Sequence, residues 1–195
     1  MTVPDRGELR LTDMSEGDTG ATVPYTDAAR ARLLMAYDAC VLADLARGAV
    51  PIGAHELNTD GTTRAPGAVL ADAARVLAAA RRFFETAAVF ERMGGADWQL
   101  IGDTLGVSPQ AARARFAMAE TGFREELLLS DGRGPAEAGE TSCLRAYMAR
   151  EPLETALDLD DWVLRHQDGD DDLGAAPVSG GLTRIDPPRH AENHF

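Results

Sequence analysis

The sequence predicts an all-α protein, a helical bundle with flexible acidic ends. Two observations support this fold class. First, apolar residues recur three and four positions apart over long stretches, which is the spacing of one face of a helix. Second, aromatic residues make up only 6% of the chain while alanine is abundant, which favours close-packed helices over a β-sandwich. Glycine and proline separate the periodic stretches, so the helices are expected to end there.

The chain divides into five segments. Residues 1–24 show no periodicity and are rich in Gly, Thr, Asp and Glu, so a disordered arm is expected there. A helical core is expected over 25–129, followed by a glycine-rich linker over 130–140. A C-terminal helical extension is expected over 141–166, and an acidic disordered tail over 167–195.

Two long helices are expected to open the core. The first begins near Thr26 and is stopped by Gly48, and the second runs from Pro66 to about Met93. The seam of the second helix alternates steps of four and three residues, and it could pack on the first helix or form a homodimer interface; the two arrangements are compatible. The seam consists of Val69, Ala73, Val76, Ala80, Phe83, Ala87 and Phe90, and it is widened by Leu70, Leu77 and Phe84.

Residues 97–116 have the pattern of two short helices joined by a glycine turn. Asp97 and Ser108 are expected to cap the two helices, and Pro109 suits the first position of the second. Gly106 can adopt the left-handed conformation that ends the first helix, and Gly102 is small where the second helix must pass closely. The apolar residues expected between the helices are Trp98, Ile101, Leu105 and Val107.

The second helix of this unit is expected to continue to about residue 128, so that the unit covers 97–128. Its residues at helical spacing form one apolar stripe, and the opposite face consists of small and polar residues with arginines at its margins. The expected buried stripe is Ala112, Phe116, Ala119, Phe123 and Leu127.

Residues 97–117 resemble the helix-turn-helix of bacterial transcription regulators and of the promoter-reading region of sigma factors. One position departs from the pattern, because Arg115 stands where that family has an apolar residue. The resemblance covers roughly a tenth of the chain, and it implies a central helix-turn-helix whose second helix enters the major groove of double-stranded DNA. The matching residues are Ile101, Gly102, Leu105, Gly106, Val107, Ser108 and Ala112.

In that setting seven residues are expected to contact DNA. Gln110 can read adenine through its amide, and Arg113 can pair with the O6 and N7 atoms of guanine. Ala114 and Ala117 are small enough to let the helix approach the base edges. The residues expected at phosphates or near the DNA backbone are Ser108, Arg115 and Arg124. The alternative to DNA binding is a helical hairpin whose outer face is an ordinary solvated surface.

The net charge of −13 opposes DNA binding, because phosphate contacts need positive charge. The distribution of charge weakens this objection. Residues 75–124 carry seven arginines and five acidic residues, a net charge of +2, whereas residues 1–74 and 125–195 carry −5 and −10. Local potential, more than total charge, governs a groove contact. All nineteen basic residues are arginine, which together with the abundant alanine suggests a high-GC bacterial genome.

The sequence shows no sign of an enzyme, a cofactor or a metal site. It contains no phosphate-binding loop, dinucleotide fingerprint or nucleophile elbow. His190 and His194 lie four residues apart but lack a third ligand, and the Asp160–Asp161 pair is expected on a solvated helix face. Two distant cysteines, no membrane-length apolar run and no signal peptide predict a soluble cytoplasmic protein with no role at a membrane.

The sequence therefore predicts a transcriptional regulator that binds specific double-stranded DNA sequences as a homodimer. Two other functions stay open. The fold could serve as a protein-binding regulatory module whose acidic surface engages a sigma factor or another regulator. The alanine-rich helices could also enclose a pocket for a small effector molecule.

Overall fold

The computed structural model describes residues 25–130, 148, 151–169 and 172–182, and these residues form an all-α fold, as predicted. The predictions that fall on residues 1–24, most of 131–150 and 183–195 lie outside this part of the chain. Within it, β-structure is confined to isolated bridges such as Leu57 with Thr63. The helices are α1 (Asp27–Gly48), α2 (Ala68–Met93), α3 (Trp98–Leu105), α4 (Pro109–Ser130) and α6 (Pro152–His166), with short 3-10 turns η1 (Ala54–Glu56) and η2 (Ser179–Gly181).

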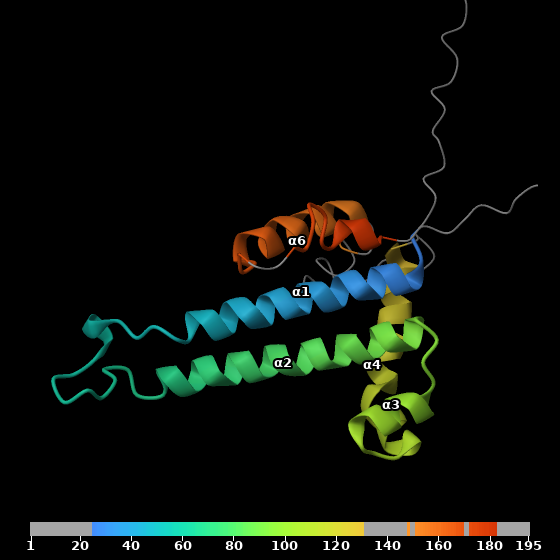
Figure 1. Cartoon of the computed structure of the whole chain (residues 1–195). Coiled ribbons are helices and arrows are strands. Elements are labelled where there is room, and N and C mark those ends of the chain that lie inside the picture. The colour runs from blue at the N-terminus through green and yellow to red at the C-terminus, as the bar shows by residue number, and fades with distance from the viewer. Residues whose placement is uncertain (1–24, 131–147, 149–150, 170–171, 183–195) are drawn as a thin grey trace, which may run out of the picture.

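Helices α1 and α2 form a long antiparallel hairpin (Figure 1). Helix α1 begins at Asp27 because the hydroxyl of Thr26 accepts a hydrogen bond from the Ala29 amide at 3.1 Å. Helix α2 begins two residues later than predicted, because Gly67 has a φ of 91° and stands outside the helix as its N-cap. Val89 of α2 belongs to a core that also contains residues of α1 and α4, and Ala79 and Thr86 of α2 are buried as well.

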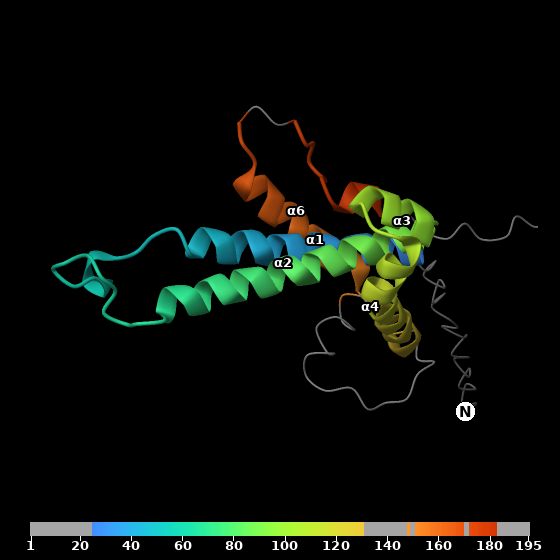
Figure 2. The same cartoon turned by 90° about the horizontal axis from the view of Figure 1, so that it is seen from below.

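The predicted seam of α2 is covered only in part, since Phe90 packs against the core shared with α1 and α4, Ala87 lines a pocket beside α3, and Val69 and Ala73 are exposed. The packing is uneven along the helix, since the C-terminal half of α2 is largely covered and its N-terminal half is not. Val69, Leu70 and Leu77 keep 53%, 74% and 53% of their surface exposed. The hairpin thus ends in a section that projects away from the other helices (Figures 1 and 2).

Helices α3 and α4 lie at the C-terminal end of α2, and α4 crosses the hairpin there (Figure 1). Phe123 and Leu127 of α4 join one core with Leu34 of α1, Val89 of α2 and Met148. The other half of α4 belongs to a separate core with α3 and α2. Helix α4 therefore ties the α3–α4 unit to the hairpin.

Helix α6 packs on α1, away from α2 (Figures 1 and 2). Leu159 of α6 and Leu33 of α1 share a buried cluster with Val178, which lies beyond the helix. The Trp162 indole N–H contacts both carboxylate oxygens of Asp44 on α1 at 3.2 Å. These contacts fix α6 against the first helix of the hairpin.

The segment after α6 is held in place by Asp160 and Arg32. The Asp160 carboxylate accepts hydrogen bonds from the Val178 and Ser179 amides at 2.6 and 3.1 Å, and Arg32 donates to the Val178 carbonyl at 3.2 Å. This packing differs from the disordered tail expected from residue 167 onwards. The prediction of a solvated Asp160 is wrong, since only 4% of this residue is exposed.

Candidate nucleic-acid interface

The turn between α3 and α4 has the local geometry that the sequence predicts. Asp97 caps α3 by accepting a hydrogen bond from the Leu100 amide at 2.8 Å, and the Ser108 hydroxyl accepts one from the Ala111 amide at 3.2 Å. Gly106 ends α3 with a φ of 66°, a conformation that glycine adopts without a steric penalty. The Val107 amide then bonds to the Gly102 carbonyl at 2.9 Å, which closes the turn.

Gly102 is the point of closest approach between the two helices. A Cβ atom at this position would lie 2.8 Å from the Val107 carbonyl oxygen and 3.1 Å from the Pro109 nitrogen. Both neighbours are backbone atoms and cannot rotate away, so the predicted need for a small residue is confirmed. This contact fixes how α4 leaves the turn.

The core beneath α4 explains which face of this helix points outward. Ala112 and Phe116 are each 1% exposed and pack with Ile101 of α3 and Ala88 of α2. The Phe116 ring meets the ring of Phe84 edge-on, with centroids 5.3 Å apart. The predicted buried stripe of α4 is confirmed at these positions and continues through Phe123 and Leu127.

One apolar residue of the turn does not lie where it was expected. Val107 was predicted to fill the gap between the two helices, but it is 44% exposed. The space is filled instead by Ile101, with Trp98 and Leu105 packed against it from α3. Trp98 is covered in turn by the Arg92 guanidinium, 4.5 Å from its ring centroid.

The expected DNA-contacting residues lie together on the outer side of α4 and its first turn, with one partial exception. Gln110 and Arg113 are exposed, and their side chains form no hydrogen bond or ion pair with other described residues. Ala117 is half-buried, so it contributes less to the outer face than predicted. The other exposed members of the set are Ser108, Ala114, Arg115 and Arg124.

Arg115, which stands where an apolar residue is expected in the helix-turn-helix pattern, lies over two aromatic rings. Its guanidinium carbon lies 4.7 Å from the Phe84 ring centroid and 5.3 Å from that of Phe116. The arginine therefore covers the edge of the aromatic pair, while Phe116 supplies the buried apolar group one position later. The charged group remains at the surface.

Arg124 belongs to an ion-pair network that the sequence analysis did not identify. Glu120 lies between Arg92 and Arg124, with nitrogen–oxygen distances of 3.1 and 3.0 Å. Burial opposes ionisation of Glu120, but the hydrogen bonds and charges of the two arginines outweigh it and hold the pKa of this carboxyl below its usual range. The four-residue spacing of Glu120 and Arg124 could have indicated their contact, whereas the pairing with Arg92 joins two helices and has no local signal.

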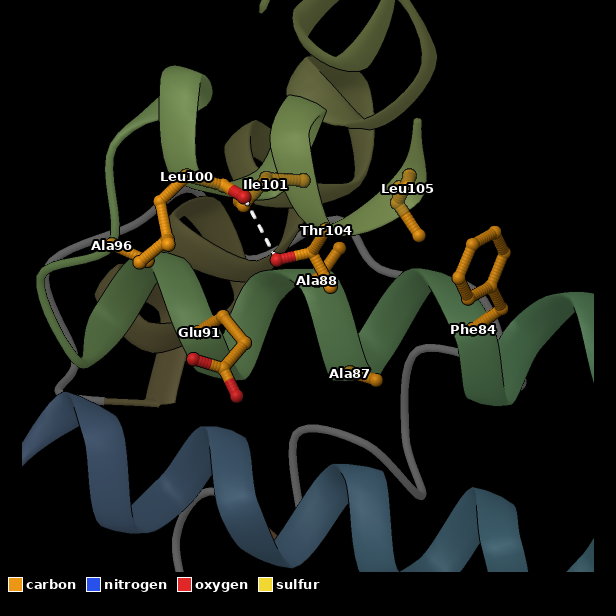
Figure 3. A pocket seen from close by; sticks show the side chains of 9 residues that line it. All are labelled: Phe84, Ala87, Ala88, Glu91, Ala96, Leu100, Ile101, Thr104 and Leu105. Atoms are coloured by element: carbon orange, nitrogen blue, oxygen red, sulfur yellow. Dashed lines mark hydrogen bonds between the residues drawn. The ribbon is translucent and has the colours of Figure 1, made fainter. Parts of the chain in front are cut away.

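An apolar pocket of about 290 Å³ lies between α2 and α3 (Figure 3). Phe84 and Leu105 stand at one end of it, and Ala96 and Leu100 at the other. The only acidic side chain that lines it is Glu91, and the Thr104 hydroxyl is bonded to the Leu100 carbonyl at 2.8 Å. The remaining lining residues are Ala87, Ala88 and Ile101.

The described residues contain no group of His, Cys, Asp and Glu side chains that could hold a metal ion. His190 and His194 lie outside them. None of the helices in the described segments is both long enough and apolar enough to cross a membrane. Comparison of the chain with protein-family models, curated proteins and solved structures found no match.

Proposed function

We propose that the α3–α4 unit is a helix-turn-helix and that the protein regulates transcription by binding specific double-stranded DNA sequences. The observation that carries this proposal is the exposed first half of α4. Gln110, Arg113 and Ala114 are exposed there, directly after a turn whose backbone packs closely against Gly102. A helix with small residues at its centre and polar residues at its margins suits the major groove.

The side chains proposed to contact DNA divide into two groups, according to whether they already contact other described residues of the chain. Gln110 and Arg113 have no described partner to give up, so they are the proposed readers of base edges. Arg115 is held on an aromatic pair with its charge at the surface, which suits a fixed phosphate contact. Arg124 would have to leave Glu120 to bind a phosphate, so its contribution should be smaller.

The charge around the turn supports this assignment. Residues 104–119 contain Arg113 and Arg115 and no acidic residue, whereas the whole chain has a net charge of −13. Two arginines give a single copy few phosphate contacts, so its binding should be weak and should depend only modestly on salt, because the salt dependence scales with the number of phosphates contacted. A homodimer would double the positive surface and is part of the proposal.

A second candidate function is a protein-binding module that engages a sigma factor or another regulator. Met118 is 81% exposed near the middle of the outward face of α4, and Leu128 is 51% exposed further along the same helix. Exposed large apolar groups are common in protein interfaces. Binding to a purified sigma factor, with no binding to duplex DNA at any salt concentration, would favour this candidate.

Selection from a pool of randomised duplexes tests the DNA-binding proposal. The full chain should enrich one motif at low salt. Ala114→Asp should abolish this enrichment, because a carboxylate on the outer face of α4 would meet the phosphates and base acceptors of the groove. The matched variant Ala78→Asp, at an exposed position of α2, should enrich the same motif as the wild type. Failure to enrich any sequence, or enrichment unaffected by Ala114→Asp, would overturn the proposal.

A further inference from the structure

The pocket between α2 and α3 is lined mainly by apolar side chains (Figure 3). Phe84 and Leu105 stand at one end of it, and Leu100, which is 55% exposed, stands at the other. An apolar cavity of about 150 Å³ holds a benzene molecule, and this pocket measures about 290 Å³. The pocket therefore has room for one aromatic ring that carries a short chain.

The polar groups that line the pocket offer a ligand no hydrogen-bond donor. The Thr104 hydroxyl has a single hydrogen, which it donates to the Leu100 carbonyl at 2.8 Å. Glu91 is exposed, and an ionised carboxylate only accepts hydrogen bonds. The Leu100 and Ile101 amides are already bonded to Asp97. An anionic ligand would therefore find no donor in the pocket and would be repelled by Glu91.

The charge around the pocket is also negative. Over residues 84–105 the only basic side chain is Arg92, and it is paired with Glu120 of α4. The Glu91 carboxylate, in contrast, has no hydrogen bond or ion pair with another described residue. A cation that approaches the pocket is therefore attracted to it. The acidic residues of this stretch are Glu85, Glu91, Asp97 and Asp103.

We infer that the α2–α3 pocket binds a small organic amine whose apolar body is an aromatic ring on a short chain. The ring fills the hollow between Phe84 and Leu100, and the ammonium group lies beside the Glu91 carboxylate. Charge complementarity and the lack of a free donor select an amine over an acid of the same shape. The inference goes beyond the proposed function and does not rest on it, because none of the proposed DNA-contacting residues lines the pocket.

A ligand in this pocket would join α2 to the α3–α4 unit. Ala88 of α2 and Ile101 of α3 line the pocket and also belong to the core that contains Phe116. The pocket exists only where α2 and α3 are packed together, so the ligand binds the folded chain alone. By mass action the melting temperature should therefore rise as the ligand concentration increases.

Titration of the full chain with phenethylamine, followed by methyl NMR, tests the pocket. The amine should shift the methyl signals of Leu100, Ile101 and Leu105, and it should raise the melting temperature. Hydrocinnamate is the matched probe, because it has the same ring and the same two-carbon chain but ends in a carboxylate. It should bind about tenfold more weakly, since Glu91 attracts the amine and repels the acid.

Two pairs of variants separate the pocket from its charge. Ala87→Leu places a larger side chain in the pocket and should abolish binding of phenethylamine, whereas Ala78→Leu, at an exposed position of α2 outside it, should not. Glu91→Gln should weaken binding of the amine by about two- to fivefold and remove its advantage over hydrocinnamate. Glu85→Gln, at an exposed position of α2 that does not line the pocket, should keep that advantage. Circular dichroism should show the same helix content in all four variants.

Three results would overturn the inference: no binding of phenethylamine at millimolar concentration, equal binding of the amine and the acid, or binding that Ala87→Leu leaves unchanged. The outcome is separate from that of the proposed function. A chain that enriches a DNA motif but does not bind the amine contradicts only the inference. A chain that binds the amine but enriches no motif contradicts only the DNA-binding function.

Discussion

Replacing Phe116 with alanine should lower the free energy of unfolding by about 3–5 kcal/mol, the usual cost of removing a buried phenylalanine. The ring is 1% exposed and packs edge-on against Phe84 in the core that joins α2, α3 and α4. Its removal would also deprive the Arg115 side chain of part of the surface it covers. Because whole domains are stable by only about 5–15 kcal/mol, this variant should unfold at a much lower denaturant concentration.

Met118→Ala is the control for this substitution. Met118 lies two residues further along the same helix but is 81% exposed, so its replacement should change stability by no more than about 0.5 kcal/mol. Chemical denaturation followed by circular dichroism measures both values. A loss of less than about 1 kcal/mol for Phe116→Ala would mean that α4 does not bury this face.

Replacing Asp160 with asparagine should lower the free energy of unfolding by about 2–3 kcal/mol at neutral pH, the order expected for hydrogen bonds to a charged group. The carboxylate holds the amides of Val178 and Ser179, and its loss should release the segment after α6. Asp161→Asn is the matched control, because the neighbouring side chain is exposed and should leave stability unchanged.

The effect of Asp160→Asn should depend on pH in a defined direction. Burial opposes ionisation of Asp160, but the Ser179 and Val178 hydrogen bonds and the Arg32 charge outweigh it, so the pKa of this carboxyl lies below its usual range. The ionised carboxyl therefore stabilises the fold at pH values above its unfolded-state pKa of about 4. This contribution is lost as the pH falls through the lower pKa of the folded state. The difference between wild type and variant should therefore shrink below about pH 4. A difference that stays constant down to pH 2 would contradict this assignment.

The sequence predicts the α3–α4 unit well because the signals that define it are local. The caps Asp97 and Ser108, the left-handed Gly106 and the small Gly102 each act within a few residues of the backbone they constrain. The buried stripe of α4 likewise follows from helical spacing alone. Helix type and turn geometry could therefore be derived without knowing what packs against them.

The features that were missed depend on contacts between distant segments. Asp160 becomes a buried acceptor only because Val178 and Ser179 return to it across a loop, and Glu120 becomes the centre of an ion-pair network only where α2 crosses α4. Val107 has an apolar side chain of the kind found in cores, but it lies exposed on the outer side of the turn. Spacing along the chain carries no information on contacts between distant segments, so the packing of the segment after α6 and the pairing of Glu120 with Arg92 could not be predicted.

Comparison of Arg113→Ala with the wild type, on the selected duplex and on its single-base variants, tests the central claim most directly. We expect a loss of about 1–3 kcal/mol on the preferred duplex, about five- to 150-fold in affinity, with discrimination lost at one guanine position. Arg47→Ala, which removes an exposed arginine at the end of α1, should bind like the wild type. If Arg113→Ala instead weakened binding equally on every duplex, or not at all, α4 would not read bases through Arg113 and the account would be contradicted.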